Sequence, residues 1–272
     1  MRADNLYATE GMPERFSFDE SVTQVFADMI RRSVPGYAQM LAMTAQIARL
    51  QANKLDRPIM VYDLGCSLGA VGHALLQVFE PHEIRLIAVD NSAPMLTQAR
   101  ALFERFEHPV ECVHADICEL DFERCDLVIS NLTLQFVDPK SRDDLIARIY
   151  DALTPGGQLI VSEKVSSGSA DPWLIEVHEQ FKRANGYSET EIAKKREALE
   201  GVLIRDSLAK HHDRFKAAGF SESHTWFQYL NFVALCAMKN DTQNSLNPES
   251  AAQAPANPDI NTKPDTNTRA PS

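Results

Sequence analysis

The sequence lacks the features of an exported or membrane-bound protein. Its start, MRADNLYATE, has no apolar core of the kind found in signal peptides, and no apolar run reaches the length that crosses a membrane. It has only five cysteines, an odd number without a C-x-x-C pair, which argues against a disulfide framework and against a cysteine metal site. We therefore expect a cytoplasmic protein with reduced thiols, no bound metal and no contact with a membrane.

Positive charge is also scarce. The chain has 27 Lys and Arg residues against 38 Asp and Glu residues, which gives a formal net charge of −11. A protein with this balance does not present a broad surface for phosphate groups, so we expect no direct binding of nucleic acid. The composition favours a small-molecule ligand and is compatible with a local basic pocket.

Large apolar side chains are almost absent from residue 240 onward, where Asn, Pro, Ser, Thr, Ala and Gln dominate. Such a segment cannot bury enough surface to offset its loss of conformational entropy, so we expect a disordered tail over residues 240–272. Residues 1–18 are expected to form a flexible N-terminus. Residues 19–239 are long enough for one α/β domain.

Short apolar runs rich in β-branched residues alternate with helical patterns, which is typical of a mostly parallel, Rossmann-like sheet. The last two of seven predicted strands form an antiparallel C-terminal hairpin. Helical spacing over residues 14–34 and 40–50 predicts an N-terminal cap, and the patterns over 172–200 predict a helical insertion before strand six. The seven strands are Ile59–Tyr62, Ile84–Asp90, Val110–Ala115, Asp126–Ser130, Gln158–Ser162, Thr225–Leu230 and Phe232–Met238.

A glycine turn follows the first strand, where Gly65, Cys66 and Ser67 lead into a helix that begins at Ala70. Backbone N–H groups and the positive end of the helix dipole would face a bound ligand there. Gly65 would let the backbone approach that ligand closely. Ser67 stands where dinucleotide fingerprints carry a second glycine, so the motif is incomplete. Taken alone, a plain structural turn is about as plausible.

Asp63 closes the first strand, and polar residues also close the next three. Because the carboxyl ends of parallel strands meet at one edge of a sheet, these side chains should line one crevice. Asp90, followed by Asn91, ends the second strand, where a carboxylate can accept hydrogen bonds from both ribose hydroxyls. The spacing favours this role over helix capping alone. Asp116-Ile117 and Asn131 follow strands three and four, although such residues are often only turn formers.

The D-L-G-x-S-x-G turn, the acids after strands two and three, and the L-x-P-G-G turn before strand five resemble the class I methyltransferases, which bind S-adenosylmethionine. This resemblance implies that Gly65 to Ser67 contact the methionine part, Asp90 the ribose, and Asp116-Ile117 the adenine amine. It implies the cofactor and not the reaction.

A narrower resemblance, from about Asp19 to Met238, is to the carboxy-S-adenosylmethionine synthases, the CmoA family. It implies conversion of S-adenosylmethionine and prephenate to carboxy-S-adenosylmethionine and phenylpyruvate by a homodimer. The product would then serve a tRNA carboxymethyltransferase that modifies a wobble uridine. The motifs that carry the resemblance include SVPGY at 33–37, NLTLQF at 131–136, TPGGQLIVSEK at 154–164, FKRANGYSE at 181–189 and KKR at 194–196.

The family also implies particular roles for three further side chains. Tyr37, expected in a turn near the ligand edge, and Asn131 correspond to cofactor contacts, although a packed aromatic is the more frequent role for a tyrosine. Arg196 would hold the new carboxylate, because a guanidinium is always charged and binds two oxygens at once. On the sequence alone, Arg196 as a solvated helix residue is the alternative.

Two basic residues in the helical insertion could contribute to binding of the second substrate. Lys182 and Arg183 could attract dianionic prephenate to an otherwise acidic protein, and ion pairs with Glu179 or Glu189 are at least as plausible.

Two other functions compete with this interpretation. A conventional small-molecule methyltransferase would bind the same cofactor, but Asn131-Leu132-Thr133 lacks the N-P-P-aromatic signature of amino-methylating enzymes. A non-catalytic module that holds S-adenosylmethionine beside a tRNA-modifying partner is the other. A scaffold needs neither Arg196 nor the cofactor loops, which argues against it.

Overall fold

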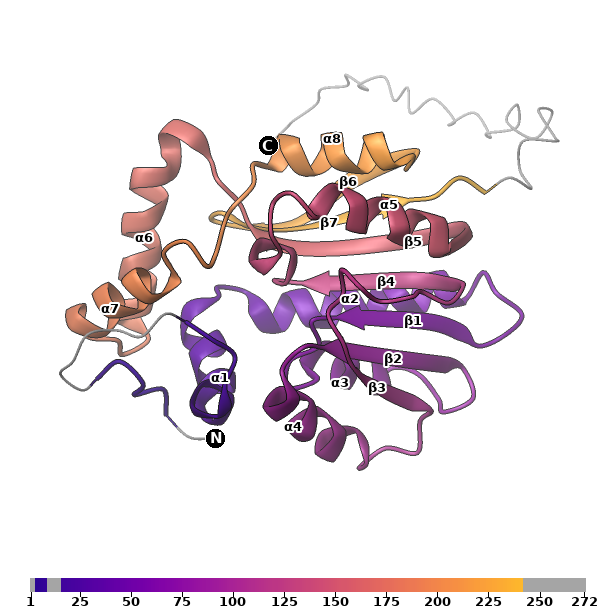
Figure 1. Ribbon diagram of the computed structural model, residues 1–272, viewed down its shortest axis with the longest axis horizontal. Helices are drawn as coiled ribbons and strands as arrows, with labels where there is room; N and C mark the ends of the chain where they lie inside the picture. The colour runs from indigo at the N-terminus through magenta and orange to yellow at the C-terminus, as the bar shows by residue number, and fades with distance from the viewer. Residues whose placement is uncertain (1–2, 9–15, 242–272) are drawn as a thin grey trace, which may run out of the picture. The chain divides into compact units, whose positions relative to one another are not determined.

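The computed structural model describes residues 3–8 and 16–241, and one seven-stranded sheet forms its centre (Figure 1). The strand order is β3-β2-β1-β4-β5-β7-β6. Strands β1 to β5 pair in parallel, and β7 runs antiparallel between β5 and β6. The predicted sheet with an antiparallel C-terminal hairpin is confirmed. The strands are β1 (Ile59–Leu64), β2 (Ile84–Asp90), β3 (Val110–His114), β4 (Cys125–Asn131), β5 (Leu153–Lys164), β6 (Glu222–Tyr229) and β7 (Phe232–Met238).

The helices begin at residues that can cap them. The Asp19 carboxylate accepts a hydrogen bond from the Val22 N–H before α1, and Ser188 forms a capping box with Glu191 at α7. In the described part, the α-helices are α1 (Glu20–Ser33), α2 (Tyr37–Ala52), α3 (Ala70–Leu76), α4 (Ala93–Phe103), α5 (Arg142–Ala152), α6 (Asp171–Ala184), α7 (Glu189–Leu199) and α8 (Leu208–Ala218).

Alternate side chains of each strand enter cores on opposite faces of the sheet. On one face, Tyr62 packs in a cluster with Ile149 of α5 and Phe215 of α8. On the other face, Val61 belongs to a cluster with residues of α2, α3 and α4, including Phe103. A sheet covered on both faces leaves its edges as the places where polar side chains from several strands can meet a ligand.

The carboxyl ends of β1 and β4 point toward α1, α6 and α7, on the left of Figure 1. Helix α1 contacts α6, and α6 contacts α7. The N-terminal cap and the helical insertion therefore lie at the same edge of the sheet. No helix within the described ranges combines the length and apolar character needed to cross a membrane.

Strand β5 begins at Leu153, five residues earlier than predicted. The expected turn Thr154–Gly157 is part of the strand, and the pairing with β4 shifts register between Cys125 and Leu127. Gly156 has a φ of +74°, and its N–H donates to the Asn240 carbonyl. The Pro-Gly-Gly signal therefore marks a bulge in a paired strand and not a free turn.

Tyr37 is the first residue of α2 and does not lie in the turn before it, which ends at Gly36 with a φ of +72°. Within the predicted flexible segment, Asp4 and Phe16 are buried, and the Phe16 N–H donates to the Ala198 carbonyl. The predicted limits of the catalytic domain, at residues 19 and 239, stay predictions. Most of the predicted tail, from Thr242 onward, lies outside the described residues.

Candidate functional site

The turn after β1 is held against the end of β2 by backbone hydrogen bonds. The N–H groups of Gly65 and Cys66 both donate to the Val89 carbonyl, at 2.8 and 2.9 Å. Ser67 takes a left-handed conformation with a φ of +51°, and its N–H donates to the Asp90 carboxylate at 2.8 Å. These contacts bring four of the predicted site residues together and fix the acid at the end of β2.

Two features favour glycine at position 65: its φ of +72° and the close approach of the Thr133 side chain. A Cβ built on Gly65 would lie 2.4 Å from Thr133 Cγ2 and Oγ1, far inside contact distance. We expected the missing side chain to make room for a ligand. The structure shows that the space beside Gly65 holds the Thr133 side chain, from the loop after β4.

Asp90 is buried and accepts two backbone hydrogen bonds, from Ser67 and from Ser92 at 2.8 Å. Burial raises the pKa of its carboxyl group, and the two N–H donors oppose that rise. The neighbouring Asn91 is exposed, and its carbonyl lies 3.0 Å from His114 Nε2. The acid is thus rigidly placed at the ligand edge.

Asp116 and Ile117 follow β3, the edge strand next to β2. Asp116 is exposed, and its carboxylate accepts a hydrogen bond from the Cys118 N–H at 2.8 Å. Ile117 is buried in the core cluster on the α5 side of the sheet. The main chain joins this loop to β2, because the Ala115 N–H donates to the Asp90 carbonyl at 3.2 Å.

Asp63 is one of the polar residues expected to line the ligand edge, but the sequence interpretation gave it no contact of its own. It is 1% exposed, and neither of its carboxylate oxygens makes a hydrogen bond of ordinary geometry within the described part of the chain. Burial, and then the charge of Asp90, raises its pKa to about 7, with the Gly72 N–H opposing the shift. The sequence signal that could have given Asp63 a separate role is its place as the Asp of the D-L-G motif. A buried acid without a partner fits a cationic ligand group.

Tyr37 and Asn131 meet at the same edge. Burial and the nearby Asp63 charge raise the pKa of the Tyr37 phenol, and a hydrogen bond with the Asn131 side chain opposes that rise. The two predicted cofactor contacts, from α2 and β4, therefore lie close to each other and to Asp63. A cation with polar substituents would find a carboxylate, a phenol and an amide there.

Arg196 lies apart from this group. It is on α7, its side chain is 65% exposed, and it forms an ion pair with Glu179 of α6 at 2.9 Å. Arg183 is also engaged, because it pairs with Glu189 at 2.8 Å and with Glu179 at 3.6 Å. For Arg183 the structure favours the ion-pair alternative over attraction of a substrate.

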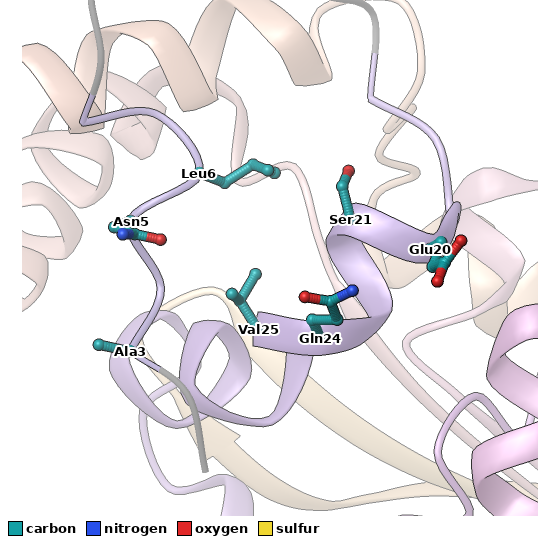
Figure 2. Close-up of a pocket in the computed structure, with 7 residues that line it drawn as sticks. All are labelled: Ala3, Asn5, Leu6, Glu20, Ser21, Gln24 and Val25. Atoms are coloured by element: carbon teal, nitrogen blue, oxygen red, sulfur yellow. The ribbon is translucent and has the colours of Figure 1, made fainter.

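A cavity of about 730 Å³ lies between the N-terminal segment and α1 (Figure 2). None of the predicted site residues lines it, and we give it no part in the site. Among the described residues, no three His, Cys, Asp or Glu side chains are grouped as a metal site would require. The cavity is lined by Ala3, Asn5, Leu6, Glu20, Ser21, Gln24 and Val25.

Comparison with known proteins places this fold in a class. A family model described as a methyltransferase domain matches residues 61–157. The CurJ carbon methyltransferase aligns with a TM-score of 0.61 at 13% identity, over 82% of this chain and 61% of that one. Magnesium protoporphyrin IX methyltransferase from Synechocystis PCC 6803, solved with bound SAH, aligns at 0.56 and 15% identity, over 77% and 86%. The chain has the class I methyltransferase fold.

Closer relatives define the family. The chain is 48% identical to the carboxy-S-adenosyl-L-methionine synthase of Psychrobacter sp. (strain PRwf-1), over 87% of this chain and 91% of that protein. It is 47% identical to the synthase of Aeromonas salmonicida (strain A449), over 84% and 93%. The chain belongs to the carboxy-S-adenosyl-L-methionine synthase family, which confirms the narrower resemblance seen in its motifs.

Proposed function

We propose that this protein converts S-adenosylmethionine and prephenate into carboxy-S-adenosylmethionine and phenylpyruvate in the cytoplasm. The product would supply the carboxymethyl group that a separate tRNA carboxymethyltransferase adds to a wobble uridine. The observation that supports this most is the match to named synthases over nearly the whole folded part of the chain. The partnerless Asp63 beside Tyr37 and Asn131 supports a cationic substrate at the sheet edge.

Each predicted contact has a physical role in this proposal. The turn from Gly65 to Ser67 would border the methionine part, but not through the N–H groups expected to face it, because these already donate to Val89 and Asp90. The Asp90 carboxylate has lone pairs left for ribose hydroxyls. Asp116 and Ile117 would border the adenine. Asp63 would compensate the positive charge of the substrate, and this ion pairing would favour the ionised acid.

The proposed reaction balances without a protein base. Prephenate loses carbon dioxide and hydroxide as its ring becomes aromatic, which supplies the driving force. Hydroxide takes a proton from the sulfonium methyl group and leaves as water, and that carbon forms a bond to carbon dioxide. The protein must then hold two substrates together, exclude water and stabilise a new carboxylate.

Arg196 is the residue that we assign to the new carboxylate. Its own side chain is 65% exposed, and Glu179 keeps a second partner in Arg183, so the guanidinium can exchange partners at small cost. We propose a homodimer in which Arg196 serves its own site or the neighbouring one. Replacing Arg196 with Ala should abolish carboxylated product while S-adenosylmethionine still binds and the melting temperature stays within about 1 °C. Product formation at the normal rate would remove Arg196 from the mechanism.

Turnover with and without prephenate tests the proposed function. Mass spectrometry should find a nucleoside heavier by one carboxylate only when both substrates are present. Methyl transfer to an acceptor without prephenate would instead support the conventional methyltransferase. Binding of S-adenosylmethionine with no turnover of either kind would support the non-catalytic module.

A further inference from the structure

Two lysines at the active edge have no carboxylate partner. Lys164, the last residue of β5, places its Nζ 3.2 Å from His178 Nδ1 and 5.4 Å from the centre of the Phe232 ring. Lys182 lies on α6. Both side chains are partly buried, and within the described ranges neither has an Asp or Glu oxygen within 4.0 Å. In a protein of net charge −11, this is an unusual concentration of unbalanced positive charge.

The nearest acids are already used by arginines. Glu179 pairs with Arg196 at 2.9 Å and with Arg183 at 3.6 Å. Asp171 pairs with Arg205 at 3.3 Å and also accepts hydrogen bonds from Ser166 and Ser167. Five cations therefore share four acids, Glu176, Glu179, Asp171 and Glu189, which leaves one positive charge over. These cations are Lys164, Lys182, Arg183, Arg196 and Arg205.

The cations also act on one another. Burial and the charges of Lys182 and Arg205 lower the pKa of Lys164 to about 7, against the opposing charges of Asp171 and Glu179. Burial lowers the pKa of Lys182, the charge of Glu179 opposes that shift, and the charge of Arg196 adds to it. The pKa of Lys195 is also lowered to about 7 by burial, but this lysine has an acid partner, since its Nζ lies 3.7 Å from Asp4 and donates to Ser33 Oγ at 2.9 Å. Buried, mutually repelling lysines are costly unless an anion joins them.

A hydrogen-bond chain connects Lys164 to the end of α1, shortly before Tyr37. His178 Nε2–H donates to the Ser33 carbonyl at 2.6 Å, which leaves Nδ1 as the acceptor for the Lys164 ammonium group. Ser33 ends α1, and Tyr37 begins α2 four residues later. Lys164 lies two residues after Ser162 in β5, and Ser162 pairs with Asn131 of β4. Lys164 therefore lies on the strand next to that of Asn131 and is linked through His178 to the segment before Tyr37, and Lys182 of the helical insertion lies close enough to Lys164 to act on its charge.

We propose that Lys164 and Lys182 bind the two carboxylates of the dicarboxylate co-substrate, with His178 orienting Lys164. This inference rests on the proposed function, in which that co-substrate is prephenate. Two ammonium groups match a dianion, and the Phe232 ring offers an apolar surface to its carbocycle. The position next to Tyr37 and Asn131 would release carbon dioxide beside the carbon that captures it. Lys164 and Lys182 are therefore binding residues for the second substrate, separate from those that hold the first.

The test compares Lys182→Met and Lys164→Met with Arg183→Met. Arg183 is the matched control, because it adjoins Lys182 on α6 and already has its own acids. Each lysine variant should raise the KM for prephenate by roughly tenfold or more, the factor expected for losing one charged hydrogen bond, with the affinity for S-adenosylmethionine unchanged. Arg183→Met should change the KM for prephenate by about twofold or less. A lysine variant that folds and keeps the wild-type KM for prephenate would overturn the assignment.

Calorimetry with prephenate separates failure of this inference from failure of the proposed function. If the wild-type protein makes no carboxylated product, the proposed function fails, and direct binding still tests the cluster. Prephenate binding that Lys182→Met weakens and Lys182→Arg restores supports the inference, and binding that is equal in all three proteins contradicts it. If Lys164→Met does not fold, Lys182→Met and Lys182→Arg decide alone, since Lys182 is only partly buried.

Discussion

At the scale of single residues, the site depends on charges held at a cost to stability. Asp63 is the clearest case, with a buried carboxyl group that lacks partners and a pKa raised from 3.8 to about 7. Because the folded protein favours the neutral acid, the free energy of unfolding falls as the pH rises from about 4 to about 7 and stays low above that range. A cationic ligand would reverse this penalty.

Replacing Asp63 with Asn should therefore stabilise the free protein and weaken ligand binding. At pH 8 we expect a gain of about 1–3 kcal/mol, or roughly 2–4 °C in melting temperature per kcal/mol. Near pH 4 the gain should vanish, because Asp63 is then neutral in both states. The affinity for S-adenosylmethionine should fall by about tenfold or more. Thermal melts and calorimetry would measure both effects.

Asp126 provides the control for Asp63. It is equally buried but lies at the start of β4, where Arg57 binds both of its oxygens at 2.7 Å. Burial raises its pKa, but hydrogen bonds from Arg57, Met60 and Thr154 outweigh burial and hold it below the usual range. Asp126→Asn should therefore lose stability at pH 8 and leave the affinity for S-adenosylmethionine unchanged. If both variants behaved alike, Asp63 would have no special role.

The pH dependence of turnover tests Lys164. Its pKa of about 7 means that the ammonium form, which binds an anion, is lost as the pH rises through that value. The KM for prephenate should rise between about pH 6 and about pH 9, while the KM for S-adenosylmethionine should change in the opposite direction as Asp63 ionises. Lys164→Arg should flatten the response, because a guanidinium stays charged throughout. A steep response that persists in Lys164→Arg would assign the titration to another group.

At the scale of elements, the β1–α3 turn is shaped by its neighbours as much as by its own sequence. Gly65→Ala must place a Cβ both at a φ of +72° and against Thr133. Gly168→Ala is the matched control, because Gly168 has a φ of +60° and no atom lies within 4 Å of the position that its Cβ would take. Gly168→Ala should cost about 1–2 kcal/mol, and Gly65→Ala about 1–3 kcal/mol more. Denaturant melts of the two variants would measure the difference; equal costs would show that Thr133 simply moves aside.

The sequence predicted the elements well where a local signal exists. Asp19, Ser92 and Ser188 cap the helices that their patterns predicted, and the apolar runs became the strands of the sheet. The predicted start of β5 was wrong, because a Pro-Gly-Gly run is typical of a turn unless its distant partner Asn240 is known. The placement of Tyr37 in a turn was wrong for a similar reason, because the same local pattern fits the turn and the first residue of the helix.

The sequence could not predict that the Asp63 carboxylate lacks hydrogen-bond partners. Its residue type and position were visible, but its lack of partners depends on how β1, α2 and β4 meet. The charge balance around Lys164 likewise depends on which acids the arginines occupy, which no spacing in the sequence states. Lys182 and Arg183 are equivalent in the sequence pattern, and only their different partners separate them.

At the scale of the whole molecule, the folded unit should be complete at Asp241. Lys239 closes it, since its Nζ donates to the carbonyls of Tyr150 and Leu153 at 2.6 and 2.8 Å, and its N–H donates to Gly157. A chain ending after Asp241 should keep its melting temperature within about 1 °C and its activity unchanged. A chain ending after Met238 loses these three contacts and should melt several degrees lower, by roughly 2–4 °C per kcal/mol. If the chain that ends after Asp241 lost activity, residues 242–272 would be needed for function, which would contradict this prediction.

In the proposed reaction, carbon from one bound substrate is captured by the other at the carboxyl ends of the strands. The most direct measurement uses prephenate labelled isotopically in its ring carboxylate, together with unlabelled S-adenosylmethionine, and follows the nucleoside product by mass spectrometry. We predict that the label appears in a product heavier than S-adenosylmethionine by one carboxylate. A nucleoside product that carries no label, or that has merely lost its methyl group, would contradict the account.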